Sequence, residues 1–207
     1  KRQFQESLQK AMRSMETGLN GLNEISITNA YSGDDAHSKN LDESAIKGAL
    51  NTPAVNRILI VAQALRHGLS IDVIHQESGF DPWFIEQIKG IVDAETDILA
   101  NGLPIGHREF HTLKVMGFSD ERLAQLSGTI TEEVTEKRIA LSIRPVYKCI
   151  DTCAAEFASQ TPYMYSTYEN AGFGPSECEA DPSDRKKIII LGGGPNRIGQ
   201  GIEFDYC

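Results

Sequence analysis

The feature that most constrains the fold of this sequence is an internal similarity between two short stretches. Gly68–Gly79, GLSIDVIHQESG, resembles Gly117–Gly128, GFSDERLAQLSG, at an offset of 49 residues. Each stretch has a serine suited to cap a helix, one short helical segment, and a Ser-Gly turn before a second helix. The similarity predicts two related helix-turn-helix hairpins packed in one small α-helical domain.

The residues before the first hairpin are also mainly helical in pattern. Apolar residues between Phe4 and Met15 recur at helical spacing, so we expect a helix there. The polar residues 28–44 are predicted to be a loop or linker. Thr52 followed by Pro53 predicts the start of a helix that Gly68 ends.

Asp81 followed by Pro82 repeats this signal for a helix start. An apolar stripe follows, made of Phe84, Ile88, Ile91, Val92, Ile98 and Leu99, with Gly102 after it. Shorter helices are expected at about 107–116, 120–126 and 131–141.

The pattern changes after Pro145. Residues 146–186 lack a clear period and are expected to be an extended connector that lies over other structure. Lys187–Leu191 is a continuous apolar run, typical of a strand buried in a parallel sheet. We therefore predict a mainly α fold: a small helical domain built of helix-turn-helix hairpins, then an extended connector and the opening strand of an α/β domain.

The charge of the chain disfavours some classes of partner. The sequence has 20 basic and 29 acidic residues, a formal net charge of −9. Such a surface repels phosphate backbones and anionic lipids, so nucleic acids and membranes are poor candidates. There are four cysteines, without a Cys-x-x-Cys pair, which fits reduced thiols in the cytoplasm. The chain lacks an initiator Met, which suggests that it begins inside a larger protein.

The hairpins nevertheless leave one alternative function open, a helical nucleic-acid-binding module. In the second hairpin, Leu123, Ala124, Gly128 and Val134 occupy the apolar, small, turn and apolar positions of such motifs. Against this, the helix that would enter the groove begins Thr131-Glu132-Glu133 and soon adds Glu136. Carboxylates there have the wrong sign for contact with phosphate.

Other conspicuous residues have an ordinary structural explanation beside a functional one. Trp83 and Phe84 follow a helix start and are expected either in the core or at a subunit contact. His107 and His111 share one helix face, but HxExH is not a zinc motif, so a solvated face is expected and no metal site is predicted. Cys149 and Cys153 are expected to be buried structural thiols.

A glycine-rich loop follows the apolar run at the end of the sequence. Gly192, Gly194 and Gly199 would shape a tight turn from a strand into a helix. A dinucleotide fingerprint needs a glycine where Arg197 stands, and a P-loop needs a lysine where Gln200 stands. The loop therefore matches neither of the two common phosphate-binding motifs.

The complete string is more specific than its glycines. Residues 192–207, GGGPNRIGQGIEFDYC, resemble the opening of the second synthetase half of carbamoyl-phosphate synthase large chains. The stretches DTCAAEF at 151–157 and YMYSTY at 163–168 resemble the connector into that half. FQESLQKAMRSME at 4–16 resembles the end of the first half, and DPWFIEQI at 81–88 and GFSD at 117–120 match the helical region between the halves. Residues 169–180 are longer than the usual connector.

This resemblance implies a domain organisation. Residues 1–17 would be the terminal helix of the first ATP-grasp half, 18–145 a helical oligomerisation domain, 146–186 the connector, and 187–207 the start of the second-half pre-ATP-grasp subdomain. The chain itself would be a non-catalytic linker that self-associates, without catalytic residues or a metal site. Its oligomer interface would include Trp83 and Phe84.

The resemblance also implies what the whole enzyme does. It would be a cytoplasmic ATP-dependent ligase that makes carbamoyl phosphate from bicarbonate, ATP and glutamine-derived ammonia, for arginine and pyrimidine biosynthesis. ATP and Mg²⁺ or Mn²⁺ would be its cofactors, and a glutaminase small subunit its partner. Arg197, Gly199, Gly201 and Glu203 would line the carbamate tunnel. An Arg197–Glu203 salt bridge that only supports the turn is the alternative role for the two charged residues.

Overall fold

The computed structural model describes residues 3–15, 17–27, 43–154, 156–157, 163–169 and 177–189. Its helices are α1 (Phe4–Ser14), α2 (Glu43–Asn51), α3 (Arg57–Arg66), α4 (Ile71–Ser78), α5 (Pro82–Asn101), α6 (His107–Val115), α7 (Asp120–Ser127) and α8 (Thr131–Ala140). Two short strands, β1 (Val146–Cys149) and β2 (Met164–Thr167), follow the helices. The predicted mainly α fold is confirmed.

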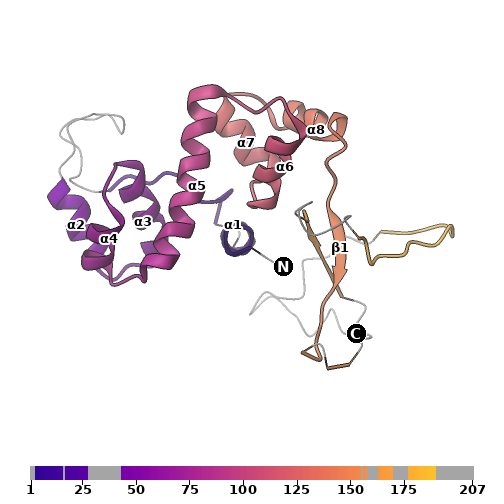
Figure 1. Ribbon diagram of the computed structural model, residues 1–207, viewed down its shortest axis with the longest axis horizontal. Coiled ribbons are helices and arrows are strands. Elements are labelled where there is room, and N and C mark those ends of the chain that lie inside the picture. Colours follow the sequence, from indigo (N-terminus) through magenta and orange to yellow (C-terminus); the bar gives the residue numbers. More distant parts are fainter. Residues whose placement is uncertain are drawn as a thin grey trace.

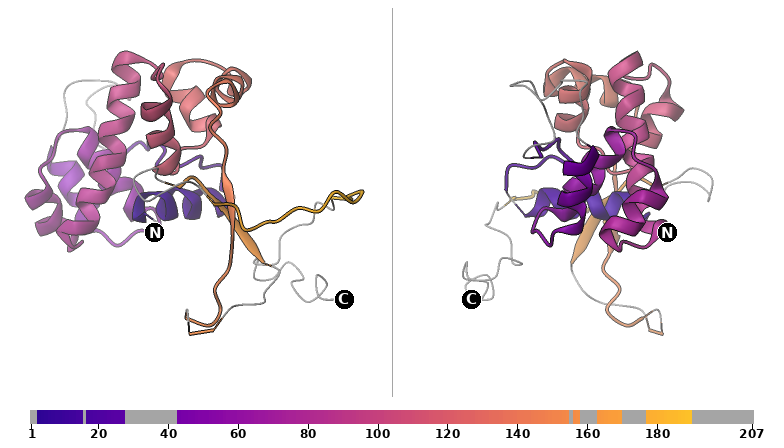
Figure 2. Two further views of the ribbon diagram at one scale, coloured as in Figure 1. Left: turned by 45° about the vertical axis from the view of Figure 1, so that its right-hand side comes forward. Right: turned by 90° about the vertical axis from the view of Figure 1, so that its left-hand side faces the viewer.

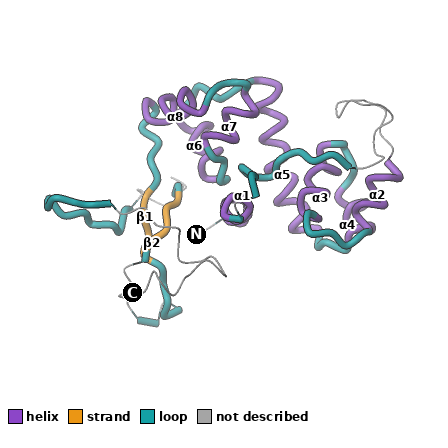
Figure 3. Tube along the Cα trace, turned by 180° about the vertical axis from the view of Figure 1, so that it is seen from behind, coloured by secondary structure: helices purple, strands orange, loops and turns teal. Residues whose placement is uncertain are grey.

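The helices form two groups joined by one long helix. In Figure 1, α2, α3 and α4 lie to one side of α5, and α6, α7 and α8 lie to the other. Helix α1 is seen end-on between the two groups, and the view from behind in Figure 3 shows the same placement. The turned views of Figure 2 show the strands following α8 in the chain, with the end of α1 beside them in the left view. The core is a single cluster that includes Leu8 and Met12 of α1.

The two predicted hairpins are confirmed, and so are the residues that cap the first helix of each hairpin. The Ser70 hydroxyl accepts a hydrogen bond from the Val73 amide, and the Ser119 hydroxyl accepts one from the Arg122 amide. Each short helix then ends at a left-handed glycine, Gly79 at φ 71° and Gly128 at φ 68°. Residues with a Cβ are strained in this conformation, which is why both Ser-Gly turns carry glycine.

The helix start predicted at Thr52-Pro53 is wrong. Thr52 instead ends α2, because its hydroxyl donates to the Gly48 carbonyl at 2.8 Å. The residue before a proline disfavours helical dihedrals, so α2 stops ahead of Pro53. Helix α3 begins only at Arg57, and Val55, which lies between Pro53 and this helix, is fully exposed.

Helix α5 begins and ends as predicted, but its buried face is turned slightly from the predicted stripe. Asp81 caps it through the Trp83 amide at 2.9 Å, and Gly102 ends it at φ 75°. Phe84 and Leu99, which the stripe included, are exposed. The buried residues of the helix are Ile85, Ile88, Ile91, Val92, Glu95 and Ile98.

The connector contains regular structure that its sequence did not predict. Strands β1 and β2 pair antiparallel, with Val146 opposite Thr167 and Cys149 opposite Met164. The described part of the predicted strand at 187–191, Lys187–Ile189, lies in no strand, and Ile188 and Ile189 are exposed. None of the helices in the described part of the chain is long and apolar enough to cross a membrane.

Candidate functional site

Three aromatic side chains form an exposed cluster where α1 meets the start of α5. The ring centroids of Phe4 and Trp83 are 5.3 Å apart, those of Phe4 and Phe84 are 5.3 Å apart, and those of Trp83 and Phe84 are 4.9 Å apart. Trp83 is 50% exposed and Phe84 is 42% exposed. The core placement considered for these two residues is therefore wrong. We call Phe4, Trp83 and Phe84 the aromatic cluster.

The aromatic cluster stands on a rigid base, because α1 is held closely against α5. The Gln5 amide donates to the Gln87 carbonyl at 3.2 Å. At Gly90 the two helices approach so closely that a Cβ would lie 2.6 Å from Gln5 Nε2. The Asp81 cap and Pro82 fix the first turn of α5, which carries Trp83 and Phe84.

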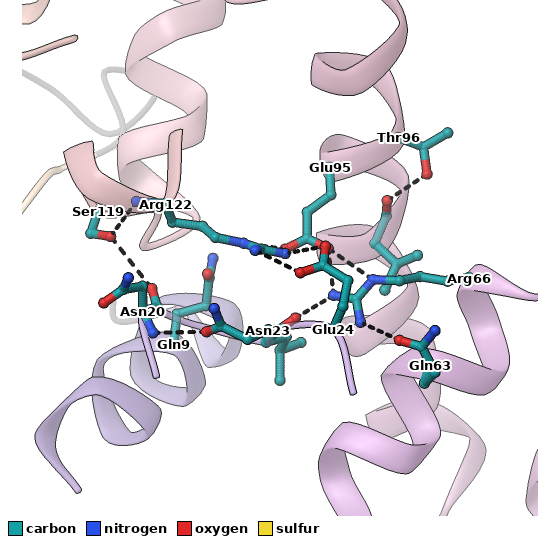
Figure 4. Close-up of polar contacts among 12 residues, drawn as sticks. Gln9, Asn20, Asn23, Glu24, Gln63, Arg66, Glu95, Thr96, Ser119 and Arg122 are labelled. Atoms are coloured by element: carbon teal, nitrogen blue, oxygen red, sulfur yellow. Dashed lines mark hydrogen bonds and ion pairs between the residues drawn. The ribbon is translucent and has the colours of Figure 1, made fainter. Parts of the chain in front are cut away.

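An ion network, buried except at the half-exposed Glu24, joins the two hairpins (Figure 4). One carboxylate oxygen of Glu95 on α5 accepts from Arg66 Nη2 of α3 at 2.6 Å, and the other accepts from Arg122 Nη2 of α7 at 2.7 Å. Arg122 also donates to both oxygens of Glu24, at 3.0 and 2.9 Å. Two carboxylates and two guanidinium groups give a network without net charge.

Pairing determines the protonation of this network. Burial by itself would lower the pKa of Arg122, but the hydrogen bonds and charges of Glu24 and Glu95 outweigh it, and the pKa is raised. Burial would likewise raise the pKa of Glu24, and the bonds to Arg122 bring it below its usual value. Both shifts favour the charged forms of Arg122 and Glu24, as expected of a structural ion pair.

A second charged group holds α8 against α6 and α7. Lys114 Nζ pairs with Asp120 at 2.7 Å, and Arg138 Nε pairs with the same carboxylate at 2.9 Å. Burial lowers the pKa of Lys114, against the opposing effect of Asp120. The two cations outweigh the burial of Asp120 and lower the pKa of that carboxyl.

The other sequence-predicted residues are not members of the aromatic cluster or of the two charged groups. His107 is exposed, as expected of a solvated face, whereas His111 is partly covered and stacks on it with centroids 5.7 Å apart. Cys149 and Cys153 are half-buried rather than buried. Within the described ranges no group of three or more His, Cys, Asp or Glu could hold a metal ion. Arg197, Gly199, Gly201 and Glu203 lie outside the described residues.

The sequence contained a signal for the buried network that went unused. Glu95 occupies the buried face of α5 between Ile91 and Ile98, where an unpaired carboxylate would be unstable. A single acidic residue at such a position indicates a buried cation elsewhere in the chain. Its partners could not be identified in this way, because Arg66 and Arg122 are distant in sequence.

Comparison with known proteins identifies the helical part. Residues 1–142 match the family model described as the carbamoyl-phosphate synthetase large chain, oligomerisation domain. The chain belongs to this family. Residues 184–207 of this large-chain family member match a second model, the carbamoyl phosphate synthase preATP-grasp domain.

Curated relatives support the assignment to the carbamoyl-phosphate synthetase large chains. Three of them carry the name carbamoyl phosphate synthase large chain. The protein of Brucella melitensis is 55% identical over 206 residues, and that of Rhizobium meliloti is 56% identical over 206 residues. The protein of Ralstonia nicotianae is 51% identical over 207 residues. Each alignment covers 100% of this chain but only 17 to 18% of the relative.

Proposed function

We propose that this chain is a non-catalytic region of a carbamoyl-phosphate synthase large chain, which self-associates and links the two synthetase halves. The observation that carries the proposal is the match of residues 1–142 to the oligomerisation domain. The match of residues 184–207 to the preATP-grasp domain supports the linking role, since a different module begins there.

The aromatic cluster is the surface that we assign to self-association with a second copy of this chain. Half-exposed Trp and Phe rings on a rigid base are typical of the residues that dominate binding energy at protein interfaces. Covering the Trp83 and Phe84 rings would remove apolar surface from water without ordering a flexible segment. The family description of the domain supports a second copy as the occupant.

The charge of the chain favours an apolar contact of this kind. Two copies that each carry a formal charge of −9 repel one another. A contact made of uncharged rings adds no further like charge to the interface. The exposed carboxylates Glu132, Glu133 and Glu136 on α8 also weigh against the nucleic-acid-binding alternative, which no observation favours.

Sedimentation velocity of purified chains tests the self-association surface. We expect the unaltered chain to sediment as an oligomer, and Trp83→Ala to shift it toward the monomer by roughly tenfold or more in Kd. Leu99→Ala is the matched control, because Leu99 is a large exposed apolar residue near the other end of α5. A Trp83→Ala chain that associates as tightly as the Leu99→Ala chain would contradict the assignment.

The activity of the whole enzyme is proposed on the names of the relatives. It would be an ATP-grasp ligase of the cytoplasm that forms carbamoyl phosphate for arginine and pyrimidine biosynthesis, with a glutaminase small subunit as partner. ATP and Mg²⁺ or Mn²⁺ are proposed for that whole enzyme, and none of the described residues is assigned to them. Carbamoyl phosphate formed by this chain alone would contradict the non-catalytic role.

The tunnel role of Arg197, Gly199, Gly201 and Glu203 also stays a proposal. Its support is the resemblance of the 192–207 string to the opening of the second synthetase half. In a full-length large chain, Arg197→Met should reduce synthesis of carbamoyl phosphate while the rate of ATP hydrolysis that depends on bicarbonate is retained. Equal losses of both activities would contradict a role in carbamate passage.

A further inference from the structure

Helix α1 is fixed on one side to the helical domain. Arg13 Nη1 donates to the Gly117 carbonyl at 2.7 Å, and Gln9 Nε2 donates to the Met116 carbonyl at 3.0 Å. At Gly117 a Cβ would lie 2.8 Å from the Cα of Glu6, so the turn between α6 and α7 touches the backbone of α1. These contacts make α1 part of the domain body.

A neighbouring face of α1, which also includes Glu6, contacts strand β2. Glu6, only 5% exposed, accepts a hydrogen bond from the Thr167 hydroxyl at 3.0 Å. Lys10 pairs with Glu6 at 2.8 Å and donates to the Ser166 carbonyl. A cavity of about 240 Å³ remains beside these contacts, lined by Glu6, Ser7, Lys10, Ile150 and Tyr165. The attachment therefore depends on a few polar anchors, with open space between helix and sheet.

Tyr168, the residue after β2, provides a second attachment to the body. Lys114 Nζ lies 5.4 Å from the centre of its ring, within the range of a cation–π contact. The His111 ring meets it edge-on, with the centroids 6.5 Å apart. Lys114 is buried and its ion pair with Asp120 holds it in place, so the Tyr168 ring contacts a cation whose position is fixed.

The outgoing chain is fastened to the other strand of the sheet. The Glu179 amide donates to the Tyr147 carbonyl at 2.8 Å, and its carboxylate accepts from the Cys149 amide at 2.7 Å. Lys148 between them pairs with Glu169 at 3.2 Å and with Glu179 at 3.4 Å. Direct contacts thus run from α1 through β2 and β1 to Glu179.

We propose that residues 146–149, 163–169 and 177–179 form a strap, which fastens the outgoing chain to α1 and makes the incoming and outgoing segments one mechanical unit. The strap lies between the two family matches, which end at residue 142 and begin at residue 184. On the proposed linking function, the strap fixes the direction in which the second synthetase half leaves, independently of self-association through the aromatic cluster.

Hydrogen exchange of the purified chain, followed by mass spectrometry, tests the strap. The double variant Lys10→Met with Thr167→Val removes both anchors on α1. We expect peptides covering β1, β2 and Glu179 to exchange roughly tenfold faster, while α3 and α5 keep their rates. Acceleration confined to β2, or none at all, would overturn the proposal, because the contacts would then not act as a unit.

Two further variants make the outcome specific. Lys89→Met is the control, because Lys89 like Lys10 forms an i,i+4 ion pair, here an exposed one with Asp93 at 2.6 Å, but lies away from the strap. It should leave exchange in the strap unchanged. Glu179→Gln perturbs the far end and should also accelerate exchange in β2. If exchange in α5 rises as much as in the strap, the anchors hold the whole fold, which contradicts the proposal.

The strap proposal and the self-association proposal can be refuted independently of each other. Lys10→Met with Thr167→Val leaves the aromatic cluster intact, so the oligomeric state measured by sedimentation should not change. A monomeric unaltered chain with a cooperative strap would refute only the self-association proposal. An oligomer whose strap anchors have no effect on exchange would refute only the strap.

Discussion

Glu95 and Arg122 meet at 2.7 Å, although only 2% of each side chain is exposed and 27 residues separate them in sequence. The pair connects the long helix α5 of the first hairpin to α7 of the second. Arg66 and Glu24 complete its charge balance from two further segments. The orientation of the two hairpins thus depends on ion pairs between α3, α5 and α7.

Glu95→Gln should destabilise the chain by about 3 kcal/mol or more, because Arg66 would lose the carboxylate with which it pairs and Arg122 would keep only Glu24. Urea denaturation followed by circular dichroism measures the loss. Asp93→Asn, an exposed carboxylate on the same helix, is the matched control and should change stability by about 0.5 kcal/mol or less. Similar losses in the two variants would show that the buried network is not a tie between the hairpins.

Stability should fall in acid through Asp120. Its pKa is lowered by Lys114 and Arg138 against burial, so the folded state binds the proton less readily than the unfolded state. The ordinary pKa of 3.8 applies to the unfolded state. Above that pH the ionised carboxyl contributes its full share of the folding free energy, and the contribution is lost as the pH falls through the lower pKa of the folded state. Urea midpoints between pH 6 and pH 2 should show this loss.

Asp120→Asn provides the control for the acid prediction. The variant cannot ionise at this position, so its stability should be lower at pH 6 and should change less between pH 6 and pH 2. Parallel pH curves for the variant and the unaltered chain would assign the acid sensitivity to other carboxyls, with Glu24 as the next candidate.

Self-association should strengthen as salt is added. Each copy carries a formal charge of −9, and the assigned contact consists of uncharged rings, so screening reduces repulsion without weakening the contact. Sedimentation at about 0.05 M and 0.5 M NaCl should show the tighter Kd at the higher salt concentration. A weaker Kd at high salt would indicate an interface held by ion pairs instead of the aromatic cluster.

Gly117→Ala should lower the stability of the fold more than Gly128→Ala does. Both glycines have positive φ, 95° and 68°, so a Cβ is strained at either position by about 1 kcal/mol. Only at Gly117 would the Cβ also meet the backbone of Glu6, at 2.8 Å, whereas Gly128 faces open space. Thermal unfolding should show a larger loss for Gly117→Ala, and equal losses would mean that α1 does not depend on this close approach.

The local part of the fold was predictable, because caps and turns depend on neighbouring residues. Ser70 and Ser119 begin their helices, and Gly79 and Gly128 end theirs, as the repeated stretches predicted. The error at Thr52 arose because the same threonine-proline pair can end one helix as readily as begin another. Helix α2, which begins at Glu43, was not predicted.

The non-local part could not be predicted in the same way. The partners of Glu95, the pairing of β1 with β2 and the meeting of Phe4 with Trp83 each join segments that no short sequence pattern relates. The aromatic pair Trp83-Phe84 was recognised as conspicuous, but its exposure depends on where α1 lies. The resemblance to a family came instead from long strings of specific residues, and the match of residues 1–142 established the family.

The central position of α1 has a consequence for synthesis of the chain. Its Arg13 contacts Gly117, 104 residues later, so the helix leaves the ribosome long before the turn that receives it. At typical elongation rates the delay is roughly 5 to 20 seconds. During that time the apolar side chains of Leu8 and Met12 have no completed core to enter. Within this region, α1 is therefore an apolar-faced helix that waits for its partners until the turn at Gly117 has been made.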